Sequence, residues 1–500
     1  MPSQMFARKP LSLLIEEMKD DNRLRRVLGP VQLTSLGIGA VIGAGIFVAT
    51  GAAAHNVAGP ALMLSYTLAG LTCIFAALCY AEFASMVPVA GSAFTYAYAT
   101  LGELFAWIIG WDLVLEYAVG SATVATGWSG YFQNVLDKVG LQLPLAVRES
   151  PWRWDAAAER FVETGSLFNL PAVLVVAAVT VILVKGIQES AAFNTAMVGI
   201  KLAAVLFVIG VGVFFIDPDN WKPFAPYGWT GISFFGIPVA GQQAGGTPVG
   251  MLAGAAIIFF AYIGFDSVST HTEEAKNPQR DVPLGIIVSL VICTVLYVAV
   301  VAVITGMVRY DQIDVNAPIS RAFAQQGIGW AEGLIAVAGV AGITSVLLVM
   351  MLSGPRVFLA MARDGLVPRG FFGSVHPRFR TPWKATILIG LFVMLLAGLG
   401  PIDWLLHLTN IGTLFAFVVV CMAVLIMRRK HPEFPRPFRV PGAPLTPLLG
   451  IAGCLLLMFS LPAGNWWRLL GWLAIGLVIY FGYGMKHSVM RGLSAKGSPP

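Results

Sequence analysis

Residues 37–47 read GIGAVIGAGIF, and they lie inside a run of 55 residues (27–81) that contains no Asp, Glu, Lys or Arg. A bilayer span takes about 20 apolar residues, so this run predicts two membrane spans, which we expect to be separated near residues 56–60. Four glycines fall within nine positions near the middle of the first span. Glycine permits both a broken helix and a close approach of backbones. Small residues also line ordinary contacts between helices, so a broken span and a tightly packed span both remain open at this stage.

The composition of the whole chain agrees with a membrane protein. The 500 residues are 57% hydrophobic and 12% charged, whereas soluble chains average about 25% charged residues. The net charge of +6 fits the basic cytoplasmic loops of membrane proteins and gives no reason to expect nucleic acid. The five cysteines lie in apolar runs without CxxC spacing, and HxxxH, HExxH and GxSxG patterns are absent from the sequence. The sequence therefore favours neither an enzyme nor a metal site.

Charge-free segments predict twelve spans and an all-α integral membrane fold. If the N-terminus is inside, inside segments hold 23 of the 32 Lys and Arg residues and outside loops hold 8. This bias predicts a multi-pass protein of the cell (inner) membrane with both termini in the cytoplasm. The predicted spans are 31–55, 59–84, 103–128, 169–186, 190–215, 248–270, 283–307, 328–353, 385–400, 403–427, 444–463 and 467–485, with a polar segment at 131–168 and a loop at 216–247.

The sixth predicted span contains a second interruption. Residues 259–267 read FFAYIGFDS, so that Gly264 lies at mid-span and Asp266 follows two residues later. A carboxylate at this depth costs about 2.5–3.5 kcal/mol on insertion scales. Spans 1 and 6 are separated by five spans, and paired interrupted segments in corresponding positions indicate a transporter binding site. The exposed amides of one half-helix suit a carboxylate and the exposed carbonyls of another suit an ammonium group; an α-amino acid carries both.

Several stretches resemble the amino acid–polyamine–organocation (APC) superfamily: residues 37–47, 80–96, 273–283 and 356–366. The chain also resembles the cationic amino acid transporter (CAT) family and its bacterial proton-coupled relatives. This resemblance rests on the sequence WDLVLEY at 111–117 and on the span layout. The resemblance covers about residues 25–430. It implies a leucine-transporter-like fold: a cytoplasmic N-terminal segment (1–30), a first five-helix repeat (31–215), an inverted second repeat (248–427), two peripheral helices (428–485) and a cytoplasmic tail (486–500). Helices 1 and 6 would be discontinuous.

The same resemblance implies a substrate site made of peptide groups. The substrate carboxylate would meet amides of span 1, and its ammonium group would meet carbonyls of span 6. The residues implied are Ile42, Gly43, Ala44 and Gly45 for the first and Phe260, Ala261 and Ile263 for the second. Ala44 departs from the family pattern, because relatives often have Ser or Thr there, so a hydroxyl contact to the carboxylate is lost.

Lys201 is the most informative single residue. It lies eleven residues into span 5, which places it about 16 Å deep and near the bilayer midplane. Burial disfavours the charged form of a lysine, so a proton could be gained and lost during a transport cycle. Lys201 resembles the lysine that occupies the sodium position in some bacterial relatives, which implies contacts near Gly39, Thr344 and Ser345. A permanently charged pin between two bundles is the alternative.

Other ionisable and aromatic residues have two interpretations each. Glu116 and Asp112 share a face of span 3, where Glu116 could take part in proton coupling, contact the substrate or hydrogen-bond to a neighbouring helix. Asp266 could cap the second half of span 6 or contact the substrate. Tyr262 could gate the site or pack against span 1. Pocket candidates on later spans are Ile343, Thr344, Ser345 and Asn410, and Glu82 is expected at an interface or gate.

These features predict a secondary active transporter for L-amino acids that works by alternating access, with proton-coupled symport as the leading mechanism. An exchanger or a uniporter without proton coupling is the alternative, and an amino acid sensor or channel is the different class. The expected partners are a small-molecule L-amino acid and the lipid bilayer, with no cofactor beyond the coupling proton. The sequence does not distinguish cationic from small neutral substrates, and it is silent on accessory subunits.

Overall fold

The computed structural model describes residues 5–10, 26–86, 92–155, 160–235, 237–244, 247–315 and 317–491. Within this part of the chain, eight helical segments are long and apolar enough to cross a membrane, and three shorter apolar helices accompany them. The first segment, Pro30–Met86, is itself interrupted and contains two helices, α3 (Pro30–Val41) and α5 (Leu62–Met86). The protein is therefore a mostly helical, multi-pass membrane protein.

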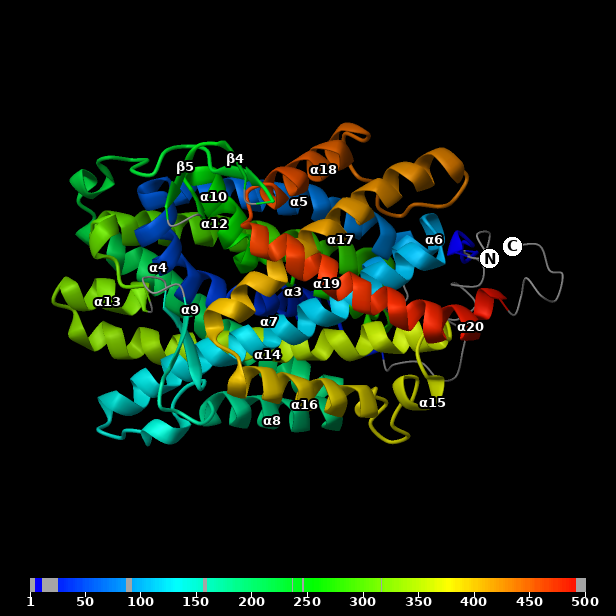
Figure 1. The fold of residues 1–500 in the computed structure, drawn as a ribbon, viewed down its shortest axis with the longest axis horizontal. Helices are drawn as coiled ribbons and strands as arrows, with labels where there is room; N and C mark the ends of the chain where they lie inside the picture. The colour runs from blue at the N-terminus through cyan, green and yellow to red at the C-terminus, as the bar shows by residue number, and fades with distance from the viewer. Residues whose placement is uncertain are drawn as a thin grey trace.

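The helices of the candidate spans form one elongated bundle (Figure 1). They are α7 (Glu103–Lys138), α9 (Ile187–Gly212), α10 (Met251–Ile258), α12 (Pro278–Met307), α14 (Gly329–Arg363), α17 (Ile402–Lys430) and α19 (Ala463–Ile479). The three shorter apolar helices are α8 (Leu170–Lys185), α16 (Trp383–Leu399) and α18 (Leu445–Met458). In Figure 1, α3 lies in the interior of the bundle, while α8 and α16 pair along one edge and α18 lies against α5 along the other. The interior position of α3 agrees with its burial from Ser35 to Val41.

Two helices extend well beyond the predicted spans. The span predicted at 103–128 continues as α7 to Lys138, and the span predicted at 328–353 continues as α14 to Arg363. Hydrophobicity marks only the part of a helix that lies in the hydrocarbon, whereas backbone hydrogen bonds extend both helices into polar sequence.

The structure agrees with the all-α membrane prediction for the spans, and it adds short strands in the loops that were not predicted. Three short antiparallel hairpins lie in the two long loops: β1 (Trp152–Asp155) with β2 (Arg160–Glu163), β3 (Ile232–Phe234) with β4 (Ile237–Ala240), and β5 (Gln242–Ala244) with β6 (Thr247–Val249). Hairpins satisfy the backbone groups of loops outside the hydrocarbon, where helices are no longer obligatory.

The described residues near the two chain ends meet at one end of the bundle. Lys9 forms a buried ion pair with Asp364, which follows α14, with 2.5 Å between Nζ and Oδ1. The amide of Val489 donates to the Asp364 carbonyl at 3.0 Å. These contacts agree with termini on the same side of the membrane, although residues 11–25 and 492–500 lie outside the described part. Helices α6 (Ala93–Thr100), α11 (Ser267–Thr270), α13 (Pro318–Gln325), α15 (Arg369–Phe372) and α20 (Met485–His487) are short.

Candidate functional site

The first span is broken where the glycine pattern suggested. Helix α3 ends at Val41, and Ile42 is extended (φ −73°, ψ 103°). A π-helical turn resumes at Gly45 and leads into α4 (Thr50–Ala53). The buried amides of Gly43, Ala44 and Gly45 donate no hydrogen bond to any described residue. A helix start leaves such donors available to an acceptor that is not part of the chain.

The sixth predicted span is broken in the same manner. Helix α10 ends at Ile258, a tight 3₁₀ turn covers Phe259–Tyr262, and Ile263 is extended (φ −57°, ψ 133°). Gly264 follows with φ +116°, a conformation that side chains with a Cβ rarely adopt. The short helix α11 then begins at Ser267. Both interruptions expected from the sequence are therefore present.

The two interruptions touch each other. A Cβ added to Gly45 would lie 2.3 Å from the Cα of Ala261, and one added to Gly264 would lie 3.0 Å from the Ala40 carbonyl oxygen. Elsewhere in the glycine-rich stretch, Gly43 lies as closely against Val346 of α14. Both interpretations left open by the sequence therefore apply, because the glycines accompany the break and also allow close packing around it.

Tyrosine hydroxyls secure the carbonyls that the breaks expose. The Tyr297 hydroxyl of α12 is shared between the carbonyls of Val41 (2.6 Å) and Ala261 (3.0 Å), one from each break. Tyr66 of α5 donates to the Gly45 carbonyl at 3.2 Å. The sequence analysis missed both residues. The available signal was a tyrosine inside an apolar span, since a buried Tyr hydroxyl usually has a hydrogen-bond partner.

Lys201 contacts α3 and α14, as expected. Its Nζ, on the fully buried side chain from α9, donates to the carbonyls of Gly39 (2.9 Å) and Ile42 (2.7 Å) and to Ser345 Oγ (2.6 Å). The two carbonyls belong to the C-terminal end of α3, where the helix dipole favours a positive charge. A contact of Lys201 near Thr344 was also expected. The Thr344 hydroxyl instead accepts a hydrogen bond from Trp128 Nε1 at 2.8 Å.

Three carboxyl groups are buried beside the second break. Asp266 occupies the position before α11, but its side chain makes no capping hydrogen bond; instead Oδ2 accepts from the Tyr117 hydroxyl at 2.6 Å. Of the two interpretations, the side-chain cap is therefore not formed, and the hydroxyl of Tyr117 from α7 is the partner of this carboxylate oxygen. Glu116 and Asp112 lie on α7 as predicted, and Asp112 faces Gly412 of α17.

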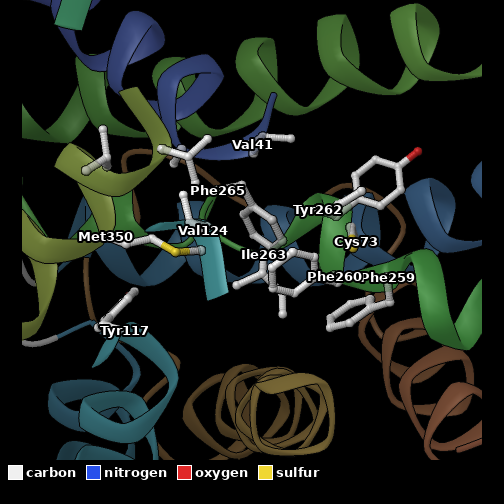
Figure 2. Close-up of a cluster of buried hydrophobic side chains, with 14 of the residues drawn as sticks. Val41, Cys73, Tyr117, Val124, Phe259, Phe260, Tyr262, Ile263, Phe265 and Met350 are labelled. Carbon is white, nitrogen blue, oxygen red and sulfur yellow. The ribbon is translucent and has the colours of Figure 1, made fainter. Parts of the chain in front are cut away.

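The remaining pocket candidates are placed by their hydrogen bonds and packing. Asn410 Nδ2 lies 3.2 Å from the carbonyls of Ala256 and Ile257, near the end of α10. Ile343 is fully buried in α14. The Tyr262 hydroxyl donates a hydrogen bond to the Tyr66 carbonyl at 2.8 Å, so α5 holds this side chain in place. In Figure 2 its hydroxyl points away from the apolar cluster around Ile263.

Figure 2 shows which side chains face the second break. Phe260, Ile263 and Phe265 from the broken segment lie opposite side chains of two other helices. Those facing side chains are Tyr117 and Val124 from α7 and Met350 from α14. Apolar side chains of α7 and α14 therefore pack beside the second break, close to the buried carboxyl group of Asp266.

Ion pairs close the end of the bundle where the chain ends meet. Glu274 pairs with Arg356 at 2.6 Å and Glu273 with Arg363 at 2.5 Å, so both acidic residues bind α14 and not their own loop. Burial raises the pKa of the Glu274 carboxyl, while the Arg356 guanidinium opposes that rise. Glu82 of α5 binds Arg428 of α17 at 2.5 Å, an interface contact as expected.

Among the described residues, no three His, Cys, Asp or Glu side chains are close enough together to hold a metal ion. The broken segments instead provide backbone donors and backbone acceptors, and Lys201 of α9 adds one buried ammonium group beside them. Peptide groups of opposite partial charge in this arrangement suit a zwitterion.

Comparison with known proteins identifies relatives over nearly the whole chain. A family profile described as amino acid permease matches residues 28–480. The chain is 46% identical to the branched-chain amino acid permease BcaP of Bacillus subtilis (strain 168) and 44% identical to the methylthioribose transporter of the same organism; each match covers 98% of this chain and 100% of the relative. It is also 34% identical to human cationic amino acid transporter 4, over 86% of this chain and 64% of that protein. These relatives are transporters and not enzymes.

Proposed function

The chain belongs to the amino acid permease family, and we propose that it is a secondary active transporter of L-amino acids that works by alternating access, with a proton as the coupling ion. The observation that carries this proposal is the pair of broken helices in contact at Gly45 and Ala261. Their peptide groups offer opposite partial charges to a substrate that carries both a carboxylate and an ammonium group.

The substrate carboxylate binds the amides of Gly43, Ala44 and Gly45, which have no partner among the described residues. The ammonium group binds carbonyls of the second break. The carbonyl of Ala261 already accepts from Tyr297, and that of Phe260 accepts a long hydrogen bond from the Ile263 amide (3.3 Å). Ile263 therefore offers the least occupied carbonyl of the three, and the other two contribute their remaining lone pairs.

Coupling to a proton runs through Lys201 in this proposal. A protonated amine has three donors and a neutral amine has two, and the structure gives Nζ three acceptors. Loss of the proton therefore removes at least one of the hydrogen bonds that tie the first half of the broken span to α14. Glu116, buried near Asp266 on the other side of the second break, is the second candidate for a proton carrier.

The proposed architecture is twelve spans in two inverted five-helix repeats, 31–215 and 248–427, followed by two peripheral helices, with both termini in the cytoplasm. The two breaks lie at corresponding positions of these repeats, in spans 1 and 6. An inverted repeat gives a protein two similar energy minima, one open to each side.

Reconstitution tests the transport proposal. Purified protein in proteoliposomes should accumulate at least one labelled L-amino acid when the outside is made acidic, and the panel should include neutral, branched and cationic amino acids. Methylthioribose belongs in the same panel, because a 44% identical relative is named as its transporter. Uptake that ignores the pH gradient but requires internal amino acid would replace symport with exchange. A chain that moves none of these solutes would refute the proposed function.

A further inference from the structure

A groove opens on the outside of the bundle between α15 and α16, far in sequence from the broken helices. It has a volume of about 340 Å³, within the range of about 300–1,000 Å³ that is typical of small-molecule sites. Its lining residues are Phe371, Trp383, Lys384, Ile387, Leu388 and Leu391. In Figure 1 these two helices lie along one edge of the bundle. Helix α16 packs against α8, α7 and α14, and its side chains Ile387, Leu388 and Leu391 are exposed.

The lining residues of α16 form a single stripe, which begins with a lysine and a tryptophan and becomes aliphatic further along the helix. Residues 384, 387, 388 and 391 have the spacing of one helical face. Lys384 and Trp383 occupy the first turn, and three aliphatic side chains follow, of which Leu391 is 57% exposed. Residues 384–391 span about 10 Å, so the stripe covers about the first half of this 17-residue helix.

The polar end of the groove carries Lys384, and the sequence around it is basic. Residues 365–402 contain no Asp or Glu, whereas four Arg or Lys residues occur there: Arg369, Arg378, Arg380 and Lys384. Lys384 donates to the Gly370 carbonyl at 3.3 Å, and its ammonium group lies 5.6 Å from the Trp383 ring centroid. It forms no ion pair with a carboxylate in the described part of the chain. Two of its three donors are therefore available to an anion.

We propose that the groove between α15 and α16 binds one anionic phospholipid, with the phosphate at Lys384 and an acyl chain along Ile387, Leu388 and Leu391. The order of groups along the groove, a cation beside an aromatic ring and then an aliphatic wall, is the order of groups along a phospholipid. The acyl chain of a neutral lipid would cover the aliphatic wall but would leave the ammonium group of Lys384 without an anion. A free phosphate would bind the ammonium group but would leave the aliphatic wall uncovered. Basic pockets at the membrane interface select anionic headgroups for this reason.

The site rests on the membrane location of the chain and not on the proposed transport activity. Arg369 of α15 connects the groove to α14, because its guanidinium donates to the carbonyls of Ala362 and Arg363. The bound lipid is thus placed beside the helix end that holds the Glu273 ion pair.

Purified full-length protein in detergent provides the test, read by native mass spectrometry and by thermal stability. Phosphatidylglycerol and phosphatidylcholine with identical acyl chains are added separately, and glycerol phosphate is added as the headgroup alone. We expect phosphatidylglycerol to bind with one tight stoichiometric equivalent and to raise the melting temperature by several degrees more than phosphatidylcholine does. Equal effects of the two lipids, or an equal effect of glycerol phosphate, would overturn the proposal.

Variants locate the site. Lys384→Gln should reduce the bound phosphatidylglycerol about tenfold, and Leu391→Trp, which fills the aliphatic part, should displace it as well. Lys486→Gln, at an exposed lysine on the same end of the bundle, is the matched control and should retain binding. If either groove variant fails to fold, a photoactivatable phosphatidylglycerol can be cross-linked to the unmodified protein: adducts should map to 371–391, and adducts confined to other helices would contradict the assignment.

Discussion

Replacement of Lys201 by methionine separates the proposed coupling role from a structural role. Methionine has a similar length and volume but no donor, so the change removes the three hydrogen bonds to Gly39, Ile42 and Ser345. Hydrogen bonds that involve a charged group contribute about 1.5–3 kcal/mol each. The change also removes the desolvation penalty of a buried ammonium group, which is several kcal/mol. These terms oppose each other, so we expect the free energy of unfolding to fall by about 3 kcal/mol or less.

The effect on transport should be much larger than the effect on stability. If one proton accompanies each substrate molecule, a gradient of one pH unit supplies about 1.4 kcal/mol and supports about tenfold accumulation. Lys201→Met should reduce the accumulation ratio to about one and make uptake insensitive to pH. Substrate should still equilibrate, because the amides and carbonyls that bind it are unchanged.

The assay is uptake of a labelled amino acid into proteoliposomes, with and without an imposed pH gradient, together with counterflow. Lys222→Met is the matched control, because Lys222 is 77% exposed and its ion pair in the described part of the chain is with the nearby Asp219. Tenfold accumulation by the Lys201→Met protein would refute the coupling role. An unfolded Lys201→Met protein would instead support the structural alternative, a charged pin between the two bundles.

Three further changes test the geometry of the breaks and of the closed end. Gly45→Ala places a Cβ 2.3 Å from the Cα of Ala261, so uptake should fall at least tenfold in the proteoliposome assay. Tyr297→Phe removes the hydroxyl shared by the two breaks and should lower the free energy of unfolding by about 1–2 kcal/mol, measured by thermal denaturation. Arg356→Met leaves Glu274 buried without its partner and should destabilise the protein by about 3–5 kcal/mol in the same measurement.

Each of these changes has a control in the chain. Gly199→Ala, at a position on α9 with open space around it, should leave uptake unchanged. Tyr80→Phe removes a buried hydroxyl that has no hydrogen-bond partner among the described residues, so stability should not fall. Introducing methionine at both Arg356 and Glu274 should recover part of the lost stability. A double variant no more stable than Arg356→Met would show that the buried ion pair is not the cause.

Hydrophobicity and glycine spacing predicted more of this protein than its charges did. The apolar runs located the helices, and the interruptions near Gly43 and Gly264 were placed within a few residues of their observed positions. The helix ends beyond the hydrocarbon were missed at Lys138 and Arg363, because polar sequence carries no membrane signal there. The hairpins of the long loops were missed for the same reason.

The partners of individual polar groups were harder to predict. Asp266 was expected to cap a helix and instead accepts from Tyr117, which lies 149 positions away in the chain. Glu273 and Glu274 bind α14 residues more than 80 positions away in the chain. No local pattern encodes such pairs, since either partner has several chemically equivalent alternatives.

The sequence by itself determined that this chain is a helical membrane protein, because so many apolar residues in long charge-free runs permit few other outcomes. It also marked the two glycine-interrupted segments as the places where a helix could break. Only the tertiary structure decided that the breaks face each other, that Tyr297 joins them and that Lys201 caps the end of α3. Those contacts join segments that are distant along the chain. They depend on how whole helices pack, and packing is settled by the fit of many side chains at once and not by any one stretch of residues.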